Sequence, residues 1–120
     1  MCGIAGIMRA GGEPVPPGQV EAMVATLRHR GPDGDGSYFA PGIGFGHTRL
    51  AIIDLSSASD QPFVDEFAGL SLIFNGEIYN YVELRQELKN LGHTFRSTGD
   101  TEVILRAYEQ WGADCLQRLN

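Results

Sequence analysis

Hydrophobic residues recur at helical spacing in three segments of the chain. The first segment has apolar residues at i, i+3, i+4 and i+7, namely Val20, Met23, Val24 and Leu27. This spacing is typical of an amphipathic helix and predicts one over 17–29. The same reasoning predicts helices over 79–91 and 101–111, which Gly92 and Gly112 end.

Short apolar runs between these segments predict β-strands. The runs cover 2–8, 36–40, 44–54, 70–75 and 93–97. Residues 56–66 are mostly polar and predict a loop. Strands and helices are partly segregated along the chain and do not strictly alternate, so the pattern predicts an α+β layered sandwich.

Composition narrows the class of protein. The chain has 120 residues, which is about one small domain, and 42% of them are hydrophobic. The formal net charge of −6 argues against nucleic acid as a partner, because phosphate binding needs clustered basic residues. No secretory signal and no apolar run of about 20 residues is visible, so we expect a cytoplasmic protein with no membrane partner.

The two cysteines and three histidines do not suggest a disulfide framework or a metal site. Cys2 and Cys115 are too few for a disulfide-rich fold. The histidines do not fall at a metal-ligand spacing with them, so no metal is expected. Cys115 lies at the apolar end of the last predicted helix and is interpreted as buried packing.

Cys2 directly follows the initiator methionine. Removal of Met1 would leave a thiol and a free α-amine on one residue. A thiolate is a nucleophile, and an α-amine with a pKa of roughly 7.7–8.0 is a useful general base. Cys2 is therefore a candidate amino-terminal nucleophile. The alternative is a small apolar residue at the start of a buried strand.

Asn75 and Gly76 end an apolar run before the second predicted helix. The Asn75 side-chain amide and the Gly76 N–H could together form an oxyanion hole, and the neighbouring Glu77 could hold an ammonium group. The alternative is that this Asn-Gly pair forms a hairpin turn.

Arg49 and Asp100 complete the set of candidate site residues. Arg49 lies among apolar strand residues and could bind a carboxylate, or it could form a structural pair with Asp54 or another acid. Asp100 could accept a hydrogen bond from a ligand amine, or it could cap the third helix. A nucleophile, an oxyanion hole, a cation and two acids match an amino acid with a reactive side-chain amide, which is glutamine.

Five motifs occur in the order found in a known family. They are MCGIAGI, RHRGPDGDG, HTRLAIIDL, FNGEIYNY and TGDTEVIL. The sequence resembles the amino-terminal glutaminase domain of class II glutamine amidotransferases, and RLAIIDL, NGEIYNY and DTEVIL are most similar to glutamine-hydrolysing asparagine synthetases. The resemblance implies an amino-terminal-nucleophile-hydrolase-like sandwich of antiparallel sheets and helices.

The resemblance also implies roles for individual residues. It makes Cys2 the nucleophile, with Asn75 and Gly76 as the oxyanion hole. The implied glutamine site consists of Arg49, Leu50, Ala51, Ile52, Ile53, Asn75, Gly76, Glu77 and Asp100. Within it, Arg49 would bind the α-carboxylate, and Glu77 and Asp100 would lie near the α-amine. The RHRGPDG loop would lie close to this pocket, with no specific step assigned to it.

The implied reaction is hydrolysis of L-glutamine through a Cys2 thioester. In the family, the ammonia passes to a synthetase domain that uses ATP and magnesium to convert aspartate to asparagine. Residues 1–120 would be the amino-terminal portion of the glutaminase domain, with the synthetase domain outside the chain, no cofactor within it, and exposed edges that leave it poorly stable or associated. A different acceptor, a non-catalytic fragment and a homodimer all stay open.

Overall fold

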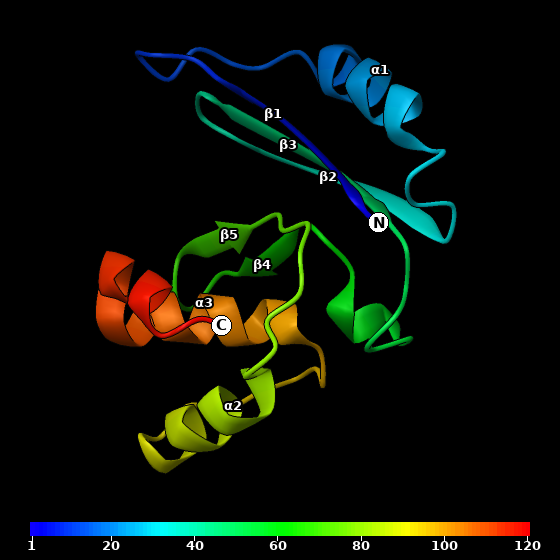
Figure 1. Cartoon of the computed structure of the whole chain (residues 1–120). Helices are drawn as coiled ribbons and strands as arrows, with labels where there is room; N and C mark the ends of the chain where they lie inside the picture. The colour runs from blue at the N-terminus through cyan, green and yellow to red at the C-terminus, as the bar shows by residue number, and fades with distance from the viewer. The chain divides into compact units, whose positions relative to one another are not determined.

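The computed structural model describes residues 1–120 and divides into two compact units. Unit 1 consists of Met1–Ile52, Asp60–Pro62 and Ile73–Gly76, and unit 2 consists of Ile53–Ser59, Phe63–Leu72 and Glu77–Asn120. Figure 1 shows the elements of both units, coloured along the chain.

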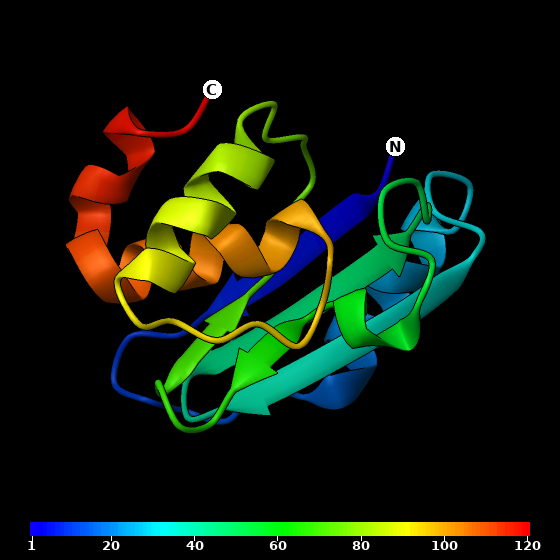
Figure 2. The same ribbon diagram turned by 90° about the horizontal axis from the view of Figure 1, so that it is seen from below.

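Unit 1 is a three-stranded antiparallel sheet with one helix. Its elements are β1 (Gly3–Met8), α1 (Pro17–Leu27), β2 (Gly34–Ala40) and β3 (Ile43–Arg49). The strand order is β1-β3-β2, so β3 is the central strand. Helix α1 lies along one face of this sheet (Figures 1 and 2).

Glycines on β3 allow α1 to pack closely on the sheet. A Cβ atom on Gly44 would lie 2.9 Å from side-chain atoms of both Val15 and Val20, and one on Gly46 would overlap Val24. These three valines are buried and form the core of the unit, with Ile7 packed against them. The apolar face predicted for the first helix is therefore the face that meets the sheet.

Unit 2 is a helical pair with a short hairpin. Its elements are η1 (Ser57–Ser59), β4 (Phe63–Asp65), β5 (Leu70–Leu72), α2 (Tyr81–Asn90), α3 (Asp100–Trp111) and η2 (Gly112–Gln117). Strands β4 and β5 are antiparallel, α2 packs beside α3, and α3 contacts β5. The buried side chains include Phe63, Leu84, Leu88, Val103, Leu105 and Cys115. The burial of Cys115 confirms its interpretation as packing.

The prediction of an α+β protein is confirmed, but two predicted strand regions are wrong. Residues 93–97 form no strand, because the main-chain N–H groups of Arg96 and Ser97 donate to the Glu102 carboxylate at 3.1 and 2.8 Å. The strand predicted over 44–54 ends at Arg49. The next two N–H groups, those of Leu50 and Ala51, bond to side chains and cannot extend the ladder.

Two smaller differences concern the third quarter of the chain. The segment 56–66 was predicted as a loop but contains η1 and β4, because Phe63 is fully buried and anchors a short strand. The strand predicted over 70–75 is limited to Leu70–Leu72. None of the helices combines the length and the apolar composition needed to cross a membrane.

Candidate active site

The Cys2 thiol lies at the end of the central strand of unit 1. Cys2 immediately precedes β1, and the pairing of Gly3 with Thr48 brings it beside the last residues of β3. Its Sγ atom accepts a hydrogen bond from the Leu50 main-chain N–H at 3.3 Å and lies 3.6 Å from the Leu50 carbonyl oxygen. The thiol is half-buried and belongs to no disulfide. The fold therefore holds a free thiol next to Arg49.

The turn-rich loop after α1 is attached to both Cys2 and the end of β3. Arg30 Nε donates to the Cys2 carbonyl at 3.0 Å. The Asp33 N–H donates to the Arg49 carbonyl at 3.0 Å, and Asp33 Oδ2 accepts from the Ala51 N–H at 2.9 Å. Sequence reasoning assigned this loop no specific contact. The charged residues between its Gly and Pro were the only signal for these bonds.

Arg49 extends from the end of β3 with its side chain 12% exposed. Its Nη1 atom lies 2.6 Å from Asp60 Oδ1, and the Asp60 side chain is 62% exposed. The sequence left open a pair with Asp54 or another acid, and the observed partner is Asp60. The guanidinium of Arg49 is thus already placed against one carboxylate at the surface of unit 1.

Asn75 and Gly76 do not form a hairpin turn. Strand β5 ends at Leu72 and α2 begins at Tyr81, so the pair lies in an extended connection between a strand and a helix. The preceding Phe74 N–H donates to Gln61 Oε1 at 2.5 Å. A Cβ atom on Gly76 would lie 2.7 Å from the ring of Phe74, so this ring packs directly on the glycine.

His47 on β3 is a buried polar residue that sequence reasoning did not place in the site. It is 0% exposed, and neither ring nitrogen has a hydrogen bond of good geometry. Burial lowers the pKa of His47, with a further contribution from Arg49. The Phe74 backbone and Asp60 oppose this shift. The ring is therefore neutral in the folded chain near neutral pH.

In unit 2, Asp100 is joined to the segment that follows Glu77. Asp100 Oδ2 accepts a hydrogen bond from the Ile78 N–H at 3.0 Å, and both residues are buried. The prediction that Asp100 caps α3 is wrong, because the N-cap position is Gly99 and Asp100 lies in the first turn. The bond places Glu77, which is exposed, next in sequence to a residue held by Asp100.

Asp54 fixes the loop that leads into Asp100. Its Oδ1 atom accepts from the Ser56 hydroxyl at 2.6 Å, and its Oδ2 atom accepts from the Thr98 N–H at 2.7 Å and hydroxyl at 2.9 Å. The bonds from Ser56 and Thr98 hold the pKa of Asp54 far below its usual range. Asp54 therefore stays ionised and ties the residue after Ile53 to this loop.

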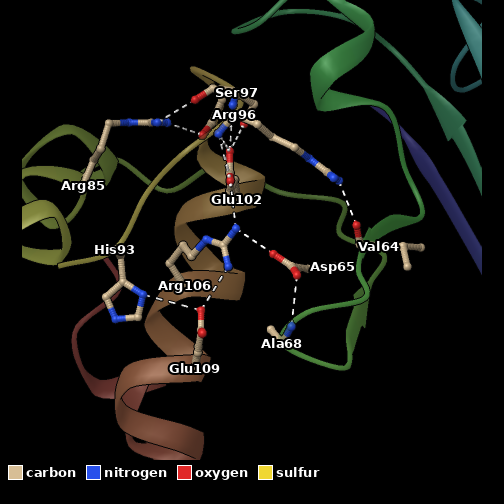
Figure 3. Close-up of polar contacts among 11 residues, drawn as sticks. Val64, Asp65, Ala68, Arg85, His93, Arg96, Ser97, Glu102, Arg106 and Glu109 are labelled. Atoms are coloured by element: carbon tan, nitrogen blue, oxygen red, sulfur yellow. Dashed lines mark hydrogen bonds and ion pairs between the residues drawn. The ribbon is translucent and has the colours of Figure 1, made fainter. Parts of the chain in front are cut away.

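A second set of polar contacts holds the same loop from α3 (Figure 3). Glu102 is 0% exposed and accepts from Ser97 Oγ at 2.7 Å, in addition to the two main-chain bonds described above. Arg85 donates to the carbonyls of Ser97 and Gly99 at 2.7 and 2.5 Å. Donors and acceptors of the loop are thus both satisfied by side chains, which makes its path independent of a strand ladder.

Arg106 connects this cluster to β4. Its Nη2 atom lies 2.6 Å from Asp65 Oδ2 and 3.4 Å from Glu102, and Nη1 lies 3.0 Å from Glu109 (Figure 3). Burial alone would lower the pKa of Arg106, but the contacts with Glu109 and Asp65 outweigh it and raise the pKa. This arginine therefore stays charged and links β4 to α3.

The predicted site residues fall in both units. Unit 1 contains Cys2, Arg49, Leu50, Ala51, Ile52, Asn75 and Gly76, and unit 2 contains Ile53, Glu77 and Asp100. Ile52 and Ile53 are 63% and 38% exposed. No group of three or more His, Cys, Asp or Glu side chains is placed to hold a metal ion. Chemically, unit 1 supplies a thiol and a guanidinium and unit 2 supplies carboxylates.

Comparison with known proteins identifies similar sequences. A family model described as glutamine amidotransferase domain matches residues 1–120. The chain is 40% identical to glutamine-hydrolyzing asparagine synthetase 3 of Bacillus subtilis over 100% of its own length and 20% of that protein. It is 43% identical to asparagine synthetase 1 of the same organism and 44% identical to asparagine synthetase 1 of Arabidopsis thaliana, over 83% and 85% of the chain. Those matches span 16% and 17% of the two relatives.

Proposed function

We propose that the chain, which belongs to the family of glutamine amidotransferase domains over residues 1–120, hydrolyses L-glutamine to glutamate and ammonia with Cys2 as the nucleophile. Residues 1–120 would be the amino-terminal portion of the glutaminase domain. The observation that carries this proposal is the Cys2 thiol, which is held at the end of β3 by the Leu50 N–H and adjoins Arg49.

The proposed chemistry is acyl transfer through a thioester. Once Met1 is removed, the α-amine of Cys2 takes the thiol proton, and the thiolate attacks the side-chain amide carbon of glutamine. The Asn75 amide and the Gly76 N–H would donate to the oxyanion. The ammonium then protonates the leaving nitrogen, the C–N bond breaks and ammonia departs. Water attacks the thioester and releases glutamate, and the thiol regains its proton.

The proposed recognition uses charge at both ends of the amino acid. Arg49 would bind the α-carboxylate, which suits a guanidinium that already accepts a carboxylate partner in Asp60. Glu77 and Asp100 would hold the α-ammonium group, and residues 50–53 would line the site. The two acids are supported by the bond from Ile78 to Asp100, which fixes the residue after Glu77.

The whole protein would use the ammonia to make asparagine. The relatives named above are glutamine-hydrolyzing asparagine synthetases, and the chain spans about a fifth of their length. We place the ATP- and magnesium-dependent amidation of aspartate in a synthetase domain outside residues 1–120. The amino-terminal-nucleophile-hydrolase-like layering, a cytoplasmic location and a role in asparagine biosynthesis belong to the same proposal.

Labelling with an electrophilic glutamine analogue tests the nucleophile. The chain, and the longer protein that carries it, are incubated with a diazoketone analogue of glutamine and analysed by mass spectrometry. We expect one adduct on an amino-terminal Cys2, suppressed by free glutamine. Cys2→Ala should remove the adduct, whereas Cys115→Ala should retain it, because Cys115 is buried. A folded, Met1-free protein that takes no label in either form would overturn the assignment.

A further inference from the structure

We infer that Gln61 is a positioning residue for the oxyanion hole. Its side-chain oxygen fixes the main chain at Phe74 and thereby sets the place of the Asn75 amide and the Gly76 N–H. This inference rests on the proposed glutaminase activity, and it gives a mechanical role to a residue outside the predicted site.

The first step is the bond between Gln61 and Phe74. The Phe74 N–H donates to Gln61 Oε1 at 2.5 Å, across 13 positions of sequence. Phe74 lies beyond the last residue of β5, Leu72, so the strand ladder does not determine its conformation. A side-chain acceptor therefore takes the place of a main-chain partner immediately before Asn75.

The second step is the anchoring of Gln61 itself. A Cβ atom on Gly36 would lie 2.5 Å from the Gln61 carbonyl oxygen and 3.2 Å from Pro62 Cδ, so this segment lies directly on β2. The preceding residue, Asp60, forms the ion pair with Arg49 at the end of β3. The segment Asp60–Pro62 is thus attached to two strands of the sheet that positions Cys2.

The third step carries the constraint from Phe74 to the two donors. The Phe74 ring packs on Gly76, with only 2.7 Å between its Cζ atom and the position of a Cβ on that glycine. Asn75 lies between the two residues and moves with them. Oxyanion donors act at about 2.7–3.1 Å, so a shift of a few tenths of an ångström in this segment weakens both.

The test compares two substitutions in the protein that carries the chain. Gln61→Met retains the length of the side chain and removes the acceptor, and Gln61→Glu retains an acceptor oxygen. We expect Gln61→Met to lower kcat for glutamine hydrolysis about tenfold with KM changed less than threefold, because a partly buried N–H loses its partner. Gln61→Glu should stay within threefold of the parent. Gln86→Met on the exposed face of α2 is the matched control and should change neither constant.

Two further measurements separate positioning from a general loss of structure. Alkylation of Cys2 by iodoacetamide forms no oxyanion, so its rate should stay within twofold in Gln61→Met. In an Asn75→Ala background the effect of Gln61→Met on kcat should fall below threefold, because the group that it positions is gone. If Gln61→Met does not fold, Gly36→Ala displaces the same segment with the glutamine intact and should give the same selective loss of kcat.

The contrary results are distinct from a failure of the proposed function. A parallel fall in alkylation and hydrolysis, an undiminished effect in the Asn75→Ala background, or a loss in Gln61→Glu equal to that in Gln61→Met would overturn the role of Gln61 while leaving the glutaminase intact. A parent protein that is folded, lacks Met1 and hydrolyses no glutamine would overturn the proposed function, and the role of Gln61 with it.

Discussion

Arg49 and Asp60 form an ion pair with 2.6 Å between Nη1 and Oδ1, at the residue proposed to bind the substrate carboxylate. The arginine is 12% exposed and the aspartate 62%, so the cation is held by β3 while the anion is largely hydrated. A hydrated partner is the easier one to displace, because water replaces its lost contact. Substrate binding at Arg49 would therefore exchange one carboxylate for another or share the guanidinium between two.

We predict that Asp60→Asn lowers the KM for glutamine about twofold to fivefold and leaves kcat unchanged. The reason is that an exposed pair is worth about 0.2–1 kcal/mol, which the substrate no longer has to overcome. Steady-state hydrolysis at low ionic strength is the measurement. Asp35→Asn, which removes the exposed partner of Arg28, is the control and should leave KM as it was. A higher KM in Asp60→Asn would mean that Asp60 supports the arginine and does not compete for it.

Two substitutions at Asp100 separate its proposed charge from its structural bond. Asp100→Asn retains an oxygen that can accept from the Ile78 N–H, whereas Asp100→Ala does not. We expect the asparagine variant to raise the KM for glutamine about tenfold or more with little change in stability, because it removes only the charge opposite the α-ammonium. The alanine variant should in addition lose about 1–3 kcal/mol of unfolding free energy. Equal stability losses in urea would show that Asp100 acts through its charge on the fold.

The sequence predicted the helices because their boundaries depend on local signals. Helix α2 packs with Leu84 and Leu88 buried, as its periodicity indicates, and α3 ends at Gly112. The strand predicted at 93–97 failed because its N–H groups are satisfied by Glu102, a contact that no local pattern encodes.

The same distinction applies to the site. Cys2, Arg49 and Asn75 could be proposed from residue type and motif order. Gln61 could not, because its significance depends on a hydrogen bond to Phe74 that only the folded chain creates. The Asp33 bonds to Arg49 and Ala51 were equally hidden.

We predict that Glu102→Gln lowers the free energy of unfolding by about 2–4 kcal/mol. Glu102 is fully buried, accepts bonds from Arg96 and Ser97, and faces Arg106 (Figure 3). An amide turns an NH₂ group toward donors and leaves the guanidinium without one of its charged partners. Urea unfolding measures the loss. Glu109→Gln, in which the replaced side chain is 37% exposed, should cost less than 1 kcal/mol, and similar losses in both variants would contradict a special role for burial.

The buried His47 predicts how stability depends on pH. Burial lowers its pKa in the folded chain, whereas the unfolded chain has the ordinary value near 6.5. As the pH falls below about 6.5, the unfolded state therefore binds a proton before the folded state does, and the free energy of unfolding decreases by at most about 1.4 kcal/mol per pH unit from this group. The bonds that lower the pKa of Asp54 act in a separate window, from about pH 4 downward.

His47→Leu should flatten this dependence between pH 6.5 and 5. The substitution replaces a ring with two unpartnered nitrogens by an apolar side chain, so stability at pH 7 should change little or rise. Urea unfolding at half-unit pH steps checks both expectations, with His29→Gln, an exposed site on the loop after α1, as the control that retains the parent slope. An unchanged slope in His47→Leu would show that the buried ring gains a proton as readily as one in the unfolded chain, which would require a polar partner for it inside unit 1.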